Sequence, residues 1–201
     1  MVQLFIDGGG FMWPILGIFI IGLAFVLERL YHLFKGLSSN ETFAYNIADS
    51  LEKSGIDFAK RQCEEGQGPV ANLCLAALDR ADRGPEEAEH ALDSSGSIEM
   101  ASMEKNMTWI SLCIATAPML GFLGTVWGMI QAFNDIKMAN DISPAVVAGG
   151  ISVALLTTAF GLVVAVILQV LQNTVLYIID NQIVTMQKAT AYILQSIDKS
   201  K

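Results

Sequence analysis

The sequence predicts an all-α membrane protein, in which three transmembrane helices carry long cytoplasmic helical extensions. Hydrophobic residues make up 53% of the 201 residues and charged residues only 16%, a balance too apolar for an ordinary soluble domain. The charged residues also leave three long gaps, at 8–27, 106–134 and 142–179. Each gap is long enough for a membrane-spanning helix, which needs roughly 20 apolar residues.

These gaps place transmembrane helices at about 10–30, 107–133 and 144–170. The third gap is longer than a bilayer requires, so its helix is expected to continue into water. We therefore divide the chain into an N-terminal region with transmembrane helix 1, a cytoplasmic helical segment, a domain of transmembrane helices 2 and 3, and a cytoplasmic C-terminal helix: 1–34, 35–106, 107–176 and 177–201.

The first apolar run is predicted to be a retained anchor. The opening MVQLFID contains no Lys or Arg, and the run ends in Glu28 and Arg29 instead of a small-residue cleavage site. Basic residues follow this run directly, at Arg29 and Lys35, and continue through the segment up to residue 105. The positive-inside rule then places the N-terminus outside, and the large loop and the C-terminus in the cytoplasm.

The cytoplasmic segment is predicted to be helical throughout. Ser39 and Asn40 can start a helix that runs to Lys53. Gly66 to Pro69 forms a break, after which Pro69 occupies the first turn of a helix over VANLCLAALDRA. These amphipathic helices are expected to pack on one another and on neighbouring subunits.

A second break is predicted at Gly84 and Pro85, followed by a helix rich in glutamate at its start. We expect this helix to run on through Met103 into the second transmembrane helix, with Gly96 as its candidate interruption. The stretch 134–144 is predicted to be a short external turn, with Ser143 and Pro144 starting the third transmembrane helix.

The composition also argues against several classes of function. With a net charge of −8, the chain is not expected to bind nucleic acids, because binding requires an excess of basic residues to neutralise the phosphates. The cysteines Cys63, Cys74 and Cys113 are too few and too widely spaced for a metal site. No nucleophile–base pair or phosphate-binding loop is visible in the sequence, so neither an enzyme nor a cofactor is predicted.

Small and hydroxyl-bearing residues gather on one face of each of the last two transmembrane helices. On the second helix, this face comprises Pro118, Gly121, Thr125, Gly128 and Ala132. On the third helix, Gln172 continues the line of a face that comprises Gly150, Ala154, Thr157, Thr158, Gly161 and Ala165. Bulky apolar residues cover the remaining surface of both helices.

Two interpretations of these faces stay open. Small residues let membrane helices approach closely, so the faces could serve packing alone. Alternatively, they line a narrow passage shared by several subunits, although threonine hydroxyls that bond their own helix do not prove a passage. No Asp, Glu, Lys, Arg or His lies at mid-depth, and Glu28 and Asp135 sit at the ends of the charge-free runs. A proton path would therefore need a carboxylate from a partner, which the threonines could solvate.

The stretches APMLGFLGTVWGMIQAF (117–133) and GGISVALLTTAFGL (149–162) resemble the MotA/TolQ/ExbB proton channel family, and within it the ExbB and TolQ branch. The resemblance implies a pentamer in the bacterial inner membrane that encloses single transmembrane helices of a dimeric ExbD- or TolR-type partner. That partner carries a transmembrane aspartate. Protons cross to the cytoplasm through it, and the resulting motion reaches TonB- or TolA-like proteins.

The resemblance also assigns residues. Thr125 matches the threonine of the family's G-T-V motif and Thr158 the threonine before A-x-G-L, both of which face the lumen. Thr157 is an additional hydroxyl in the same face and the third candidate for lining the lumen and the proton path. Two departures stand out, since Val153 replaces a glutamate found in many members and Ile167 replaces a proline. Neither departure changes Thr125 or Thr158.

Three functions follow as hypotheses. The first is an ExbB-like motor subunit that uses the proton motive force to energise TonB-dependent transport across the outer membrane. The second is a TolQ-like subunit for envelope maintenance, or a stator for gliding or motility. The third, from a different class, is a non-conducting membrane scaffold whose small faces serve packing only. Replacement of the threonines by valine is expected to be harmless in the scaffold and damaging in a motor.

Overall fold

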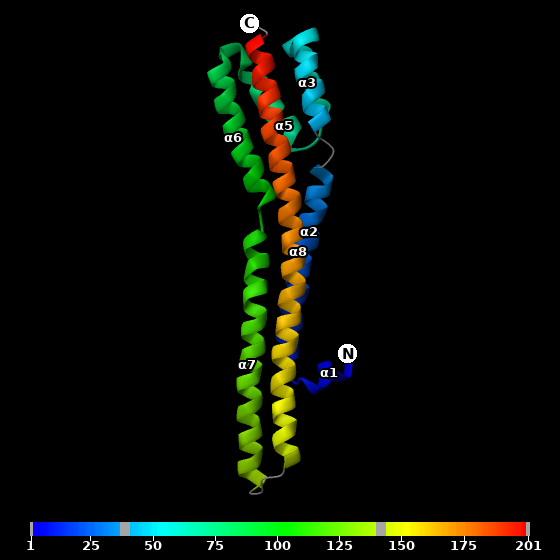
Figure 1. The fold of residues 1–201 in the computed structure, drawn as a ribbon, viewed down its shortest axis with the longest axis vertical. Coiled ribbons are helices and arrows are strands. Elements are labelled where there is room, and N and C mark those ends of the chain that lie inside the picture. Colours follow the sequence, from blue (N-terminus) through cyan, green and yellow to red (C-terminus); the bar gives the residue numbers. More distant parts are fainter. Residues whose placement is uncertain (1, 37–40, 140–143, 200–201) are drawn as a thin grey trace. The chain divides into compact units, whose positions relative to one another are not determined.

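The computed structural model describes residues 2–36, 41–139 and 144–199, and the regular structure within these ranges is helical (Figure 1). The helices follow one another along the chain as α1 (Val2–Asp7), α2 (Met12–Gly36), α3 (Glu41–Ser54), α4 (Ile56–Glu65), α5 (Pro69–Arg80), the short 3-10 helix η1 (Ala81–Arg83), α6 (Pro85–Met103), α7 (Met107–Ala139) and α8 (Pro144–Lys199).

Three helical stretches among the described residues are long and apolar enough to cross a membrane: Met12–Phe34, Pro85–Met138 and Val147–Asp198. Length and composition alone identify them. The second stretch combines α6 with α7, and its charge-free part lies in α7. The all-helical fold with three apolar stretches agrees with the predicted multi-pass membrane protein.

The described residues form two compact units. Unit 1 draws on the ranges 1–27 and 106–174, and unit 2 on the ranges 28–105 and 175–201. Both α2 and α8 contribute residues to each unit.

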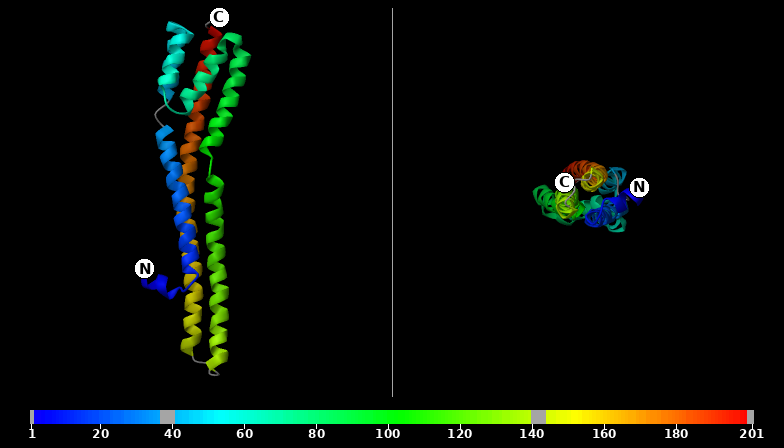
Figure 2. Two further views of the ribbon diagram at one scale, coloured as in Figure 1. Left: turned by 180° about the vertical axis from the view of Figure 1, so that it is seen from behind. Right: turned by 90° about the horizontal axis from the view of Figure 1, so that it is seen from below.

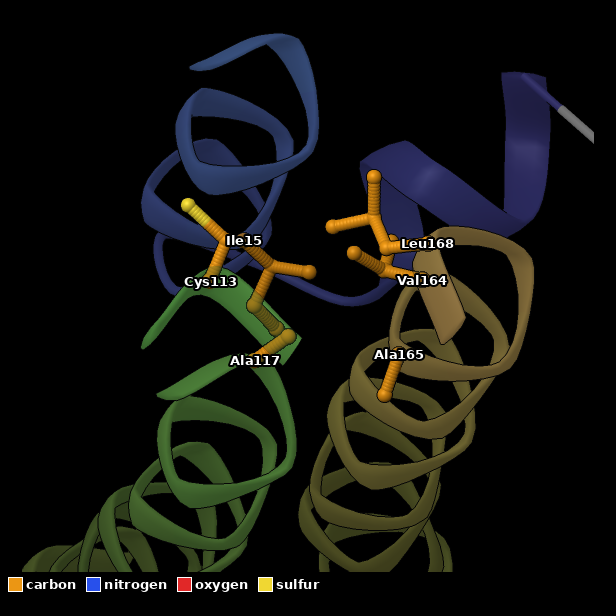
Figure 3. Packing of buried hydrophobic residues seen from close by; sticks show 6 residues of the cluster. All are labelled: Ile15, Cys113, Ala117, Val164, Ala165 and Leu168. Atoms are coloured by element: carbon orange, nitrogen blue, oxygen red, sulfur yellow. The ribbon is translucent and has the colours of Figure 1, made fainter. Parts of the chain in front are cut away.

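In unit 1, α7 runs alongside the N-terminal part of α2 and the first half of α8 (Figure 2). Their shared core consists of Ile15, Cys113, Ala117, Val164, Ala165 and Leu168 (Figure 3). The bulky apolar side chains on the other faces of the helices stay exposed, as Leu155 illustrates at 63%. Within this chain, those faces are available to lipid or to neighbouring subunits.

Helix α1 was not predicted from the sequence. The chain turns between α1 and α2 at Gly9, whose left-handed backbone, with φ +74°, is a conformation that glycine adopts readily. Phe5 of α1 meets Trp13 of α2 edge to face, with ring centroids 5.4 Å apart. Since six residues make too short a helix to stand alone, this aromatic contact helps to hold α1 in place.

In unit 2, α5 supplies much of the core. Its residues Val70, Leu73, Cys74 and Leu78 are buried, which confirms the amphipathic helix predicted for this segment. Pro69 lies in the first turn of α5, as predicted, and Pro85 starts α6 in the same way after the break at Gly84. The sequence did not delimit α4 as a separate helix.

The side chain of Arg29 is 2% exposed, and its guanidinium caps the C-terminal end of α6 in unit 2. Its Nη1 donates to the carbonyl oxygen of Ser102 at 3.0 Å, and the same guanidinium pairs with the carboxylate of Glu28. A cation is favourable at a helix C-terminus, where carbonyl groups have no intrahelical partner.

The prediction that one helix runs from Glu86 into the second transmembrane helix, with Gly96 as its candidate interruption, is wrong about where the helix breaks. Helix α6 ends at Met103, and Asn106 adopts a left-handed backbone with φ +66°. Asparagine tolerates this conformation better than most residues, and one such residue ends an α-helix. Gly96, by contrast, lies inside α6 without breaking it.

The expected turn at 134–144 is shorter than predicted, because α7 continues to Ala139. The predicted caps Ser39, Asn40 and Ser143 lie outside the described residues.

Candidate functional site

The small faces of α7 and α8 pack directly against each other in unit 1. A Cβ atom added at Gly161 would lie 2.6 Å from the carbonyl oxygen of Ala117, and one at Gly121 would lie 2.9 Å from that of Thr157. These are backbone atoms, which cannot move aside as a side chain can. We call the line of contact the α7–α8 seam, and it brings together most of the small residues singled out in the sequence.

The remaining small residues also lie in or beside the α7–α8 seam. A Cβ at Gly128 would lie 3.2 Å from Ala154, and Gly150 faces Ala132. Ala165 belongs to the core shared with α2. Pro118 is half-buried inside α7, where its missing N–H leaves out one intrahelical hydrogen bond.

Thr125 and Thr158 meet across the α7–α8 seam, and their hydroxyl oxygens contact each other directly. Thr125 Oγ1 also lies 3.0 Å from the carbonyl oxygen of Ala154, and Thr158 Oγ1 lies 3.2 Å from that of Gly121. Both side chains are half-buried, so part of each threonine lies at the surface of the chain.

Thr157 has a different environment from the other two threonines. Its side chain is 1% exposed, and Oγ1 donates to the carbonyl oxygen of Ala154 at 2.8 Å. It fills the space left by the missing side chain of Gly124, where an added Cβ would lie 2.7 Å from both Cβ and Oγ1 of Thr157. Thr157 therefore has almost no surface of its own in this chain with which to line a passage.

A second polar pair in the α7–α8 seam was missed by the sequence analysis. Gln172 is 8% exposed, and its Nε2 donates to Ser111 Oγ at 2.6 Å. Ser111, Pro118 and Thr125 follow one another at intervals of seven residues, so all three lie on the same face of α7. Extending the face by one heptad would have found Ser111.

A cavity of about 340 Å³ opens beside the α7–α8 seam, between the glycine turn after α1 and the two helices. Its lining includes Gly9, Trp127, Val153 and Thr157. The position where the resemblance leads one to expect a glutamate therefore presents an apolar side chain to this cavity.

The chemistry available at the seam is that of hydroxyl and amide groups. The charged side chains in the described part of unit 1 are Asp7, Asp135 and Lys137, which lie outside the stretches of α7 and α8 that carry the threonines. Hydroxyl groups donate and accept hydrogen bonds without titrating near neutral pH. The seam can therefore solvate a proton-carrying group but offers no carboxylate of its own.

The protein-family comparison covers this site. A model of the MotA/TolQ/ExbB proton channel family matches residues 65–188, which include α5, α6, α7 and the seam-forming part of α8.

Individual proteins with similar sequences carry the names ExbB and TolQ. A biopolymer transport protein ExbB homolog of Methanothermobacter thermautotrophicus is 34% identical over 184 residues, which cover 91% of this chain and 65% of the relative. The biopolymer transport protein ExbB of Neisseria gonorrhoeae is 28% identical, covering 76% of this chain and 77% of the relative. The Tol-Pal system protein TolQ of Pseudomonas aeruginosa is also 28% identical, covering 61% and 62%. The chain thus spans less than two thirds of the length of the Methanothermobacter relative.

Proposed function

Because the chain belongs to the MotA/TolQ/ExbB proton channel family, we propose that it is an ExbB-like subunit of a motor driven by the proton motive force in the bacterial inner membrane. In this proposal, several copies surround the transmembrane helices of an ExbD-type partner. The partner's carboxylate carries the protons, and the resulting motion energises TonB-dependent transport across the outer membrane. The lumen-facing groups are Thr125 and Thr158.

The observation that carries the proposal is the half-buried hydroxyl pair of Thr125 and Thr158 in a unit without charges along the seam. A carboxylate in hydrocarbon loses several kcal/mol of hydration, which only hydrogen-bond donors or cations can offset. The two hydroxyls can supply such donors without a fixed charge. A fixed cation would hold the carboxylate in its ionised form, whereas hydroxyls let it take up and release protons.

Self-association is the second part of the proposal. The exposed bulky residues of α7 and α8 form broad apolar faces, including Phe122, Trp127 and Leu162. One chain presents a single Thr125–Thr158 pair, so a closed ring of copies is needed to surround a guest helix with hydroxyls. By family resemblance the ring is a pentamer.

A TolQ-like role in envelope maintenance is the second candidate, since a Tol-Pal system protein TolQ is among the relatives. The site chemistry is the same in both roles, and the transducer protein that receives the motion decides between them. For a TolQ-like subunit, that transducer is TolA-like instead of TonB-like. A gliding or motility stator is a further variant of the same motor.

The non-conducting scaffold draws on a different observation, namely that the threonines bond each other and backbone carbonyls within one chain. Hydrogen bonds between membrane helices contribute about 0.6 kcal/mol on average. Replacing one threonine by the near-isosteric valine therefore costs too little to prevent folding. If the hydroxyls served packing alone, such variants would be fully active.

The experiment is a comparison of proton flux. The tagged chain is purified from the membranes of its native host with its co-purifying proteins, reconstituted into vesicles and energised with a pH gradient. We expect Thr125→Val and Thr158→Val to lose at least tenfold in flux while the size of the particle is unchanged. Undiminished flux in the double valine variant would refute the proposed role of the two threonines, and a wild-type complex that conducts no better than empty vesicles would favour the scaffold.

A further inference from the structure

Three threonine hydroxyls compete for two backbone carbonyls in the α7–α8 seam. The carbonyl oxygen of Ala154 lies 2.8 Å from Thr157 Oγ1 and 3.0 Å from Thr125 Oγ1. Within α8, it also accepts the N–H of Thr158, four residues on. A carbonyl oxygen has two lone pairs, so only one of the two hydroxyls can make a full hydrogen bond to it.

The carbonyl of Gly121 is shared in the same way. It accepts the N–H of Thr125 within α7, and it lies 3.2 Å from Thr158 Oγ1 and 3.3 Å from Thr125 Oγ1. Thr125 is thus the more distant hydroxyl at the Ala154 carbonyl, whereas Thr125 and Thr158 lie almost equally far from the Gly121 carbonyl. Each hydroxyl has a single proton to donate.

These distances give one consistent assignment of the three protons. Thr157 donates to the Ala154 carbonyl, and Thr158 donates to the Gly121 carbonyl. Both carbonyls are then saturated, so the proton of Thr125 points to the oxygen of Thr158, which it contacts directly. In this assignment, Thr125 is the hydroxyl whose proton bonds another side chain and not a backbone carbonyl.

Thr157 keeps its hydrogen bond to the Ala154 carbonyl because its side chain has no room to rotate. It is 1% exposed, and it is pressed against the backbone of α7 at Gly124. Its acceptor lies three residues earlier on the same helix, so the bond does not depend on the spacing between α7 and α8.

We propose that Thr157 is a positioning residue that acts through Thr125. By occupying the Ala154 carbonyl, it keeps the Thr125 proton available for donation to an anionic guest, which is a carboxylate on a helix from another chain. This inference rests on the proposed function and adds a role for a residue that does not itself face the guest. Without the Thr157 hydroxyl, Thr125 turns to the vacated Ala154 carbonyl and the guest loses a donor.

The consequence is a change in how flux depends on pH. A hydrogen bond to the ionised form of a carboxylate stabilises that form, so losing it lets the carboxylate take up its proton at higher pH. A bond of ordinary strength corresponds to a shift of about 0.5–1 pH unit. The other titratable side chains in the described part of unit 1 are Asp7 on α1 and Cys113, Asp135 and Lys137 on α7, and the variants leave all of them unchanged.

The test uses the same native complex in vesicles, with flux measured between pH 5 and 9. Thr157→Val removes the hydroxyl at nearly constant volume, and Thr157→Ser keeps the hydroxyl while removing a methyl group. We expect the half-maximal pH to rise by about 0.5–1 unit in Thr157→Val and to stay at the wild-type value in Thr157→Ser. Thermal unfolding of both variants reports on packing separately.

The outcomes distinguish this inference from the proposed function. If Thr125→Val abolishes flux but Thr157→Val leaves the half-maximal pH unchanged, the positioning role of Thr157 is wrong. The proposed motor function is then still supported. An equal shift in Thr157→Ser and Thr157→Val would assign the effect to packing and also overturn the role. If Thr125→Val conducts as the wild type does, both the proposed function and the inference fail.

Discussion

At the scale of single residues, the hydroxyls of α7 and α8 are placed by glycines on the opposite helix. Thr157 fits against Gly124, and the carbonyl of Gly121 receives Thr158. A larger residue at either glycine would separate the helices and open every hydrogen bond between them. The same contacts therefore serve helix packing and the proposed solvation of a guest carboxylate.

Two buried thiols in unit 2 give a test at the same scale. Cys63 and Cys74, from α4 and α5, are 2% and 0% exposed, and a hydrogen bond with Cys63 together with burial raises the pKa of Cys74 well above its usual range. Because both thiols are buried, the reagent cannot reach them, and we expect neither to react with N-ethylmaleimide at pH 7.5 until the chain is denatured. Arg61→Cys, at an exposed position of α4, provides the reactive control. Rapid labelling of the native thiols would contradict this packing.

The raised pKa also predicts a pH dependence of stability. Above about pH 8.5, the thiol of an unfolded chain loses its proton while the folded chain keeps it. The unfolded state then binds fewer protons, so the free energy of unfolding falls as the pH rises further. Thermal unfolding between pH 7 and 10 should show this decline, and Cys74→Ala should make it shallower. An identical slope in the variant would mean that Cys74 does not contribute.

At the scale of elements, the close approach of α7 and α8 is set by Gly161 and Gly121. We expect Gly161→Leu to separate the two helices, because its side chain would overlap the backbone at Ala117. Overpacking costs about 1–3 kcal/mol or more. The matched control is Gly149→Leu in the same helix, where an added Cβ meets nothing within 4 Å. Thermal unfolding in detergent should separate the two variants, and equal stability would show that the seam is not tightly packed.

The elements also show what the sequence could and could not predict. The small faces of α7 and α8 follow from a period of about 3.6 residues, and the helices at Pro69 and Pro85 follow from proline at the first turn. The break before α7 was missed because it depends on the left-handed backbone of Asn106, which no composition signal marks. Helix α1 was missed because a six-residue helix has no periodicity to detect.

The candidate site was predictable only in part. The pattern predicted that Thr125 and Thr158 lie on small faces, and the structure brings them into contact. The burial of Thr157 against Gly124 was not foreseen, because a helical projection gives an angle and not the depth at which two helices meet. The pair of Ser111 and Gln172 was missed for a simpler reason, since the face was traced only as far as Pro118 on α7.

At the scale of the whole molecule, the topology is a prediction from the distribution of basic residues. Single cysteines at exposed positions can test it, because the three native thiols are buried. We expect Lys137→Cys to react with a membrane-impermeant maleimide from outside intact spheroplasts, and Glu89→Cys to react only after lysis. The reverse pattern would invert the orientation and with it the direction of proton entry.

The central claim is that copies of this chain surround a helix from another protein, with Thr125 and Thr158 facing it. A density map of the particle purified from native membranes tests this most directly. The account predicts a closed ring whose centre holds at least one foreign helix, with a carboxylate at the level of the two threonines. A map in which both threonines face lipid, or in which the centre has no room for a helix, would contradict it.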